Sequence, residues 1–121
     1  MGYRNTKQKM MILDLISKYG HLGVEEIKDL LSSEDVSQAT IYRNINILAA
    51  EGKIKKICSD NVVKYEIIKE HHYHFECSCC KKVYDIDPSL IQITVNESIA
   101  EVTNKTLFLY GICNECKNIN N

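Results

Sequence analysis

The sequence predicts an α/β (α+β) chain in two parts: a helical N-terminal half that ends in a β-hairpin, and a smaller α/β half held together by a metal ion. Three observations support this prediction. Three segments before residue 52 carry apolar residues at helical spacing, and two β-rich runs then flank a polar turn. Two Cys-x-x-Cys pairs follow, at Cys77/Cys80 and Cys113/Cys116. We expect the two domains to be residues 1–68 and 69–121.

The composition limits the class of protein. Apolar residues make up 45% of the 121 residues and charged residues 26%, which is typical of a globular chain and not of a disordered one. The longest apolar runs span only a few residues, and no signal-peptide core follows the N-terminal basic residues. We therefore expect a cytoplasmic protein with no membrane partner. In that compartment the six cysteines are more often metal ligands than disulfides.

Two helices are expected in the first 31 residues. The first has Thr6 as its N-cap, ends near Lys18 before Tyr19-Gly20, and has Met10, Leu13 and Ile16 on its apolar face. The second covers residues 24–31. Its predicted buried residues are Val24, Ile27, Leu30 and Leu31.

A third helix is expected from Gln38 to Glu51, with Ser37 as its N-cap and Gly52 as its stop. Its buried stripe is Ile41, Ile45 and Leu48. The opposite face has no acidic residue and offers Gln38, Thr40, Tyr42, Arg43 and Asn46. Amide, hydroxyl, phenol and guanidinium groups suit phosphates and base edges of DNA, although an ordinary amphipathic helix can also have a polar face.

Residues 53–58 and 62–68 read as a β-hairpin around the turn Ser59-Asp60-Asn61. Three short helices followed by a hairpin form a winged helix-turn-helix, in which the third helix reads DNA. Lys53, Lys55 and Lys56 would then lie where the wing meets the phosphate backbone. The sequence therefore predicts a DNA-binding module in the first 68 residues.

The second half begins with strands at residues 73–77 and 83–86 around a tight turn. Residues 89–103 contain many β-branched side chains, yet their apolar residues fall at helical spacing, so we expect a helix there. Residues 106–112 are expected to form a strand and residues 117–121 a polar tail.

Cys77, Cys80, Cys113 and Cys116 form two Cys-x-x-Cys pairs, a spacing that lets four thiolates bind one tetrahedral Zn²⁺. Four protein ligands leave no open position, so we expect this zinc to be structural. The alternative is disulfides or redox-active pairs, which require an oxidising compartment. Two cysteines remain: Cys58 is expected to be buried in the hairpin, and Cys79 lies inside the turn without an assigned role.

The histidines indicate a second metal site. His72 and His74 lie on the same face of a strand because side chains alternate, and Glu66 and Asp85 are close enough in sequence to come from neighbouring strands. Two imidazoles and two carboxylates suit Fe²⁺ or Mn²⁺ better than a thiolate set does. The alternative is a solvated histidine pair on a sheet surface.

Three motifs stand together in the second half: His-x-His-x-x-Cys-x-x-Cys at 72–80, an acid five residues later, and Tyr-Gly-Ile-Cys-x-x-Cys at 110–116. With them, the chain resembles the ferric uptake regulator (Fur) family. Residues 4–9 and the run Ala-Thr-Ile-Tyr-Arg at 39–43 agree as well. The family implies a homodimer with an N-terminal winged helix and a C-terminal α/β dimerisation domain. It also implies a metal-dependent repressor that binds a double-stranded DNA operator and is not an enzyme.

Site residues carry over from the family by position. The resemblance adds His21 to Glu66, His72, His74 and Asp85 as ligands of the regulatory Fe²⁺ or Mn²⁺, and it places Arg4, Tyr42 and Arg43 on DNA. One departure is Lys81, which stands where the family usually has glycine. Asp85 resembles the peroxide regulator (PerR) branch, whereas Glu66 does not. We therefore expect a peroxide signal, with iron sensing as the alternative.

Two other kinds of function are weighed against this one. The run His74-Phe75-Glu76 with a later Cys-x-x-Cys would match a zinc nucleobase deaminase. This chain, however, has no proline before Cys113, and a deaminase site would leave Cys77 and Cys80 without a role. A zinc-ribbon interaction module would bind one zinc per chain. A metal sensor would bind zinc and a second, exchangeable ion.

Overall fold

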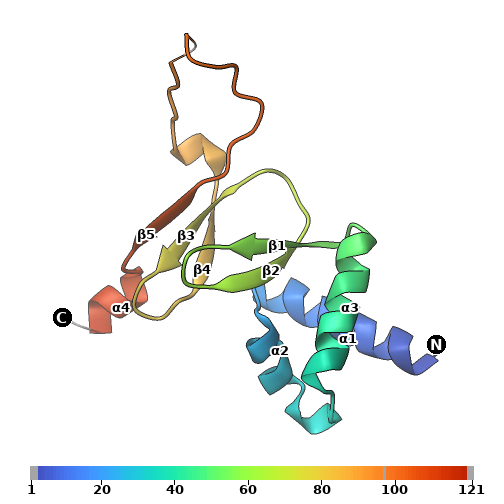
Figure 1. Cartoon of the computed structure of the whole chain (residues 1–121). Helices are drawn as coiled ribbons and strands as arrows, with labels where there is room; N and C mark the ends of the chain where they lie inside the picture. Colours follow the sequence, from blue (N-terminus) through green and yellow to red (C-terminus); the bar gives the residue numbers. More distant parts are fainter. Residues whose placement is uncertain (1–2, 97, 120–121) are drawn as a thin grey trace. The chain divides into compact units, whose positions relative to one another are not determined.

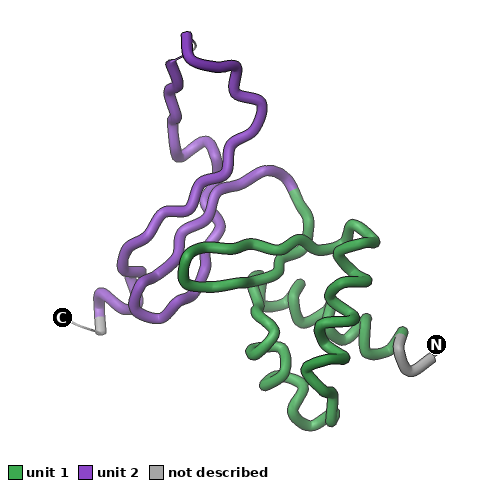
Figure 2. Tube along the Cα trace, viewed as in Figure 1, with its two compact units in different colours: residues 1–69 green, residues 70–121 purple. Residues whose placement is uncertain are grey.

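The computed structural model describes residues 3–96 and 98–119, with the side chains of residues 6–96 and 98–118. The chain divides into two compact units, which Figure 2 shows in green and purple. The N-terminal unit is Met1–Lys69 and the C-terminal unit is Glu70–Asn121. In the described part of the chain, no helix has both the length and the apolar character needed to cross a membrane.

The N-terminal unit consists of helices followed by a hairpin (Figure 1). Strands β1 and β2 are antiparallel, with Ile54 opposite Ile67 and Lys55 opposite Glu66. This order confirms the predicted helix-turn-helix with a β-hairpin after it. The elements are α1 (Tyr3–Tyr19), α2 (Val24–Leu30), a 3₁₀ turn (Ser32–Glu34), α3 (Gln38–Ala50), β1 (Ile54–Cys58) and β2 (Val63–Ile67).

The ends of α3 follow from local chemistry. The Ser37 side chain accepts a hydrogen bond from the Thr40 backbone N–H at 3.2 Å, as an N-cap does. Gly52 has a φ of +74°, a left-handed conformation that favours glycine after a helix. The predicted N-cap at Thr6 is wrong, because α1 already begins at Tyr3 and Thr6 lies inside it. An interior threonine costs a helix only a few tenths of a kcal/mol, so the residue type alone does not start one.

The core of the N-terminal unit lies where α1 and α2 pack on α3 and the hairpin. Two predicted core residues are wrong: Met10 is 44% exposed and Leu30 is 40% exposed. Met10 lies two residues before Ile12, which turns it by about 200° to the opposite side of the helix. The most deeply buried apolar side chains are Ile12, Ile16, Ile27, Ile41, Ile45, Leu48 and Ile54.

The C-terminal unit is a three-stranded sheet with the order β4-β3-β5. Strands β3 and β4 are antiparallel, whereas β3 and β5 are parallel. A parallel neighbour requires a long connection, and residues 87–107 supply it (Figure 1). The elements are β3 (Tyr73–Cys77), β4 (Val83–Ile86), a 3₁₀ turn (Pro88–Leu90), β5 (Phe108–Gly111) and α4 (Asn114–Ile119).

The predicted helix over residues 89–103 is wrong. After the 3₁₀ turn, residues 91–96 and 98–107 have no helix or strand. The apolar side chains that would form the buried face are exposed, with Leu90 at 78% and Ile99 at 80%. Helices in proteins depend on packing of an apolar face, and in the described part of the chain the apolar side chains of this segment remain exposed. The predicted polar tail is also wrong at its start, because α4 continues through Lys117 to Ile119.

Candidate metal centres

The four predicted zinc ligands lie together in the C-terminal unit. Cys77 ends β3 and Cys80 follows in the turn, while Cys113 and Cys116 lie at the start of α4 just after β5. The parallel pairing of Cys77 with Gly111 brings the two pairs to the same end of the sheet. The four Sγ atoms all lie within 4.8 Å of one another.

The geometry of this cluster fits Zn²⁺. Zinc–sulfur bonds of about 2.3 Å in a tetrahedron place the sulfur atoms about 3.8 Å apart. The Sγ atoms of Cys80 and Cys113 are 3.9 Å apart. Cys77, Cys113 and Cys116 are buried, and none of the six cysteines forms a disulfide. These residues form a closed thiolate set of the kind that holds a structural zinc.

Backbone hydrogen bonds prepare the cluster for metal binding. The N–H groups of Cys113 and Cys80 each donate to the Cys77 sulfur at 3.4 Å, and they lower the pKa of Cys77 to about 6. Burial raises the pKa of Cys116. The Tyr84 hydroxyl donates to Cys113, which raises the pKa of Tyr84 to about 12. The role of Tyr84 was not predicted from the sequence. Its position in β4, one residue before the predicted ligand Asp85, was the one sequence feature that could have pointed to it.

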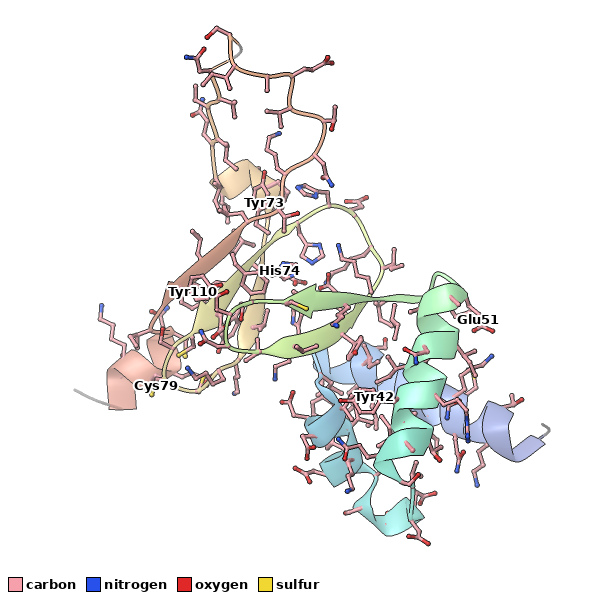
Figure 3. All side chains as sticks on the ribbon, viewed as in Figure 1. Tyr42, Glu51, Tyr73, His74, Cys79 and Tyr110 are labelled. Carbon is pink, nitrogen blue, oxygen red and sulfur yellow. The ribbon has the colours of Figure 1, made fainter. Side chains whose placement is uncertain are left out.

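The two remaining cysteines lie outside the cluster. Cys79 is exposed inside the turn, where Figure 3 labels it. The prediction that Cys58 is buried in the hairpin is wrong, because Cys58 is exposed at the end of β1. Its partner across the hairpin, Val63, is 48% exposed as well, so both side chains of this last pair in the hairpin are open to solvent.

Lys81 adopts the left-handed conformation in this turn, with a φ of +66°. A side chain in that region costs roughly 1 kcal/mol, and glycine avoids the cost. Lys81→Gly is therefore expected to stabilise the zinc-loaded protein by up to about 1 kcal/mol. Part of this gain is offset because glycine raises the conformational entropy of the unfolded chain. A higher urea midpoint checks this expectation. Lys82→Gly is the matched control and should not raise the midpoint; an equal rise in both variants would contradict the strain.

In the N-terminal unit, His21 and Glu66 form a pair. Leu22 and Tyr65 exchange two backbone hydrogen bonds, at 3.1 and 2.8 Å, and this bridge holds the segment after α1 beside β2. His21 Nε2 consequently lies 3.0 Å from Glu66 Oε1. The Glu66 side chain is only 1% exposed. An imidazole nitrogen and a buried carboxylate are two donors for a divalent cation, which is too few to hold it alone.

In the C-terminal unit, His72, His74 and Asp85 form a second group. His74 lies opposite Asp85 in the β3–β4 register, and His72 precedes it on the same face. The Asp85 Oδ1 atom is 3.2 Å from His72 Nε2 and 3.8 Å from His74 Nε2. The Glu70 carbonyl lies 2.8 Å from His72 Nδ1, and this hydrogen bond orients the ring so that Nε2 is the nitrogen that faces Asp85.

The predicted DNA-facing side chains lie on α3. Tyr42 is 45% exposed, and Arg43 is exposed beside it (Figure 3 labels Tyr42). Gln38 donates a hydrogen bond to Glu25 at 3.2 Å, and the Thr40 hydroxyl accepts one from Ser37 at 3.0 Å. Arg4 lies in the first turn of α1, and its side chain is outside the described residues.

Comparisons with known proteins agree on one family. The model of the "Ferric uptake regulator family" matches residues 1–112. A peroxide-responsive repressor PerR from Staphylococcus epidermidis is 32% identical, over 96% of this chain and 83% of the relative. A ferric uptake regulation protein from Campylobacter upsaliensis is 31% identical, over 95% and 81%. The solved Helicobacter pylori ferric uptake regulator, described as having three functional metal-binding sites, superposes with a TM-score of 0.70 at 26% identity, covering 92% of this chain and 80% of that one.

Proposed function

Because the chain belongs to the ferric uptake regulator family and is a metal-responsive transcriptional regulator, we propose that it is a cytoplasmic, metal-dependent repressor. It binds a palindromic operator in double-stranded DNA as a homodimer. The observation that carries the proposal is a nitrogen/oxygen donor group in each unit, His21 with Glu66 in one and His72, His74 and Asp85 in the other. The His21–Glu66 pair is too small to hold a divalent cation by itself, and one ion held by both groups would couple the DNA-binding unit to the other.

The five donors suit the regulatory ion. The donor set is three imidazoles and two carboxylates, from His21, Glu66, His72, His74 and Asp85. Nitrogen and oxygen donors suit Fe²⁺ or Mn²⁺ better than the thiolates of the four-cysteine cluster do. The family resemblance assigns all five to one ion. Zinc in the four-cysteine cluster is then permanent and structural. The second ion binds and leaves as its concentration in the cell rises and falls.

The segment after β4 supports the homodimer. In this segment Leu90 is 78% exposed and Ile99 is 80% exposed, and Ile93, Val95 and Val102 are 38–44% exposed. Exposed apolar residues in one stretch are typical of an interface between subunits. The second copy of the chain would cover them.

The DNA-binding surface follows from α3 and the wing. Gln38, Thr40, Tyr42 and Arg43 lie in the first two turns of α3, outside its buried stripe, and the first turn has no acidic residue. An arginine that binds guanine and a polar helix in the major groove are the usual means of reading a base sequence. By its match to the family, Arg4 adds a basic contact in the minor groove.

We propose peroxide as the signal, and Asp85 carries this choice. A single oxygen of this short carboxylate faces both imidazoles, which favours an ion with an open position for hydrogen peroxide. Bound Fe²⁺ would lend the electron that cleaves the O–O bond and would recover it from the imidazole ring as the ring is oxidised. Overall, hydrogen peroxide would give one oxygen atom to the imidazole of His21 or His72 and release the other as water. An oxidised imidazole no longer binds the ion, the two units uncouple, and repression ends.

Peptide mass spectrometry tests the signal. Protein loaded with Zn²⁺ and Fe²⁺ and exposed to peroxide should gain one oxygen atom on the His21 or His72 peptide, with loss of DNA binding. The Mn²⁺-loaded protein is the matched control and should gain none, and Asp85→Glu should suppress the reaction in the iron form.

The alternative is an iron-responsive repressor, which Glu66 favours because the peroxide branch more often has aspartate at this position. Relatives of both kinds are about equally identical to this chain. Unmodified histidine peptides in the iron form, with DNA binding retained after peroxide, would identify the iron-responsive repressor.

A further inference from the structure

The hairpin of the N-terminal unit places a lysine on the buried carboxylate of Glu66. Lys55 in β1 is the direct cross-strand partner of Glu66 in β2. The Lys55 Nζ atom is 3.8 Å from Glu66 Oε2, while the other oxygen, Oε1, is 3.0 Å from His21 Nε2. The Lys55 side chain is 49% exposed and that of Glu66 only 1%. A solvent-accessible ammonium therefore reaches a carboxylate that has almost no contact with water.

A buried carboxylate is costly unless a cation or hydrogen-bond donors compensate its charge. Without a metal ion, Lys55 supplies a cation on one oxygen of Glu66. A divalent cation at the same carboxylate would replace that compensation and would also repel the ammonium. The four-carbon stem of lysine allows the ammonium to move out to water while the hairpin stays in place.

We propose that Lys55 is a built-in competitor for the regulatory ion, and that it raises the metal concentration at which the protein responds. Metal and ammonium compete for the same buried carboxylate. This inference rests on the proposed role of Glu66 as a metal ligand. It adds a residue to the site that is not itself a ligand and that acts on the ion through Glu66.

The neighbouring lysines of the wing do not share this position. Lys53 lies 4.0 Å from Glu51 at the end of α3. Lys56 is exposed, and its cross-strand partner is Tyr65, not an acidic residue. Lys56 therefore provides a matched control with the same charge, the same strand and no described contact with Glu66.

The test is a titration of zinc-loaded, full-length protein with Mn²⁺, followed by calorimetry or by the electron paramagnetic resonance of free Mn²⁺. Lys55→Gln is expected to bind Mn²⁺ about fivefold more tightly than the wild type, the upper end of what a half-exposed ion pair contributes. Lys56→Gln is expected to leave the affinity within about twofold, because a distant exposed charge is screened by solvent. Zinc content and oligomeric state confirm that each variant is folded.

A double-mutant cycle shows whether the effect passes through Glu66. In a Glu66→Gln background, which keeps the zinc cluster, Lys55→Gln should no longer tighten Mn²⁺ binding. Equal affinity of wild type and Lys55→Gln, or an equal gain in Lys56→Gln, overturns the role of Lys55 while the regulatory site stands. A wild-type protein that binds no second ion overturns both the regulatory site and this inference.

Discussion

The Cys116→Ser protein is expected to lose its zinc, the proposed dimeric state and most of its stability in a single step. Cys116 is buried, and its sulfur belongs to a set of four within 4.8 Å of one another. Three thiolates cannot complete the tetrahedron. Zinc binding and folding are coupled in small metal domains, where the bound ion contributes on the order of 10 kcal/mol. The C-terminal unit, residues 70–121, has only 52 residues. A unit of this size buries too little apolar surface to replace that contribution.

The measurement combines zinc analysis by mass spectrometry, the oligomeric state by light scattering, and thermal unfolding. Cys79→Ser and Cys58→Ser are the matched controls, because both remove a thiol that is exposed. Each control should keep one zinc per chain and lose less than about 0.5 kcal/mol. A Cys116→Ser protein that is free of zinc yet fully dimeric would refute the four-cysteine assignment.

Elements with strong local signals could be predicted from the sequence. Ser37, with its hydrogen bond to the Thr40 amide, and Gly52, with its positive φ, bound α3 almost at the predicted residues. The hairpin turn and the strands 73–77 and 83–86 also follow the predicted ranges. The four cysteines come together as expected because their spacing reflects what a tetrahedral ion requires.

Features that depend on distant packing could not be predicted. The apolar spacing of residues 89–103 is genuine, but the spacing of a segment does not reveal whether one chain contains a surface that can bury it. The exposure of Cys58 and Met10 has the same cause, since residue type says little about which side of an element the core lies on. The Lys55–Glu66 pair required the hairpin register, which the turn length determines.

The candidate site divides in the same way. The donor types of His72, His74 and Asp85 and their period of two indicate a nitrogen/oxygen group, and the structure brings these three together. His21 carried no signal of its own, because it lies alone in a loop. Its position beside Glu66 follows from the bridge between Leu22 and Tyr65, which are 43 residues apart in the sequence. Only the family resemblance pointed to His21 in advance.

Replacing Arg43 with alanine is expected to abolish specific DNA binding while the dimer and its zinc remain intact. Arg43 is exposed on α3 beside Tyr42, and no hydrogen bond or ion pair of its side chain has been identified among the described residues, so its loss should not disturb the fold. A bidentate arginine–guanine contact discriminates against the wrong base by about 1–3 kcal/mol. A two-fold symmetric dimer makes the contact twice, so the loss is expected to reach about 2–6 kcal/mol.

Fluorescence anisotropy measures this loss on an operator selected from random duplexes by the Mn²⁺-loaded wild-type protein, with a scrambled duplex of equal length as the non-specific reference. The difference in affinity between the two duplexes should nearly vanish in Arg43→Ala, and the affinity for the scrambled duplex should fall only slightly. Lys117→Ala removes an exposed charge from α4 in the other unit and should retain the full difference. If Arg43→Ala discriminates between the duplexes as well as the wild type does, α3 does not read the operator, and the wing and the N-terminal basic residues become the next candidates.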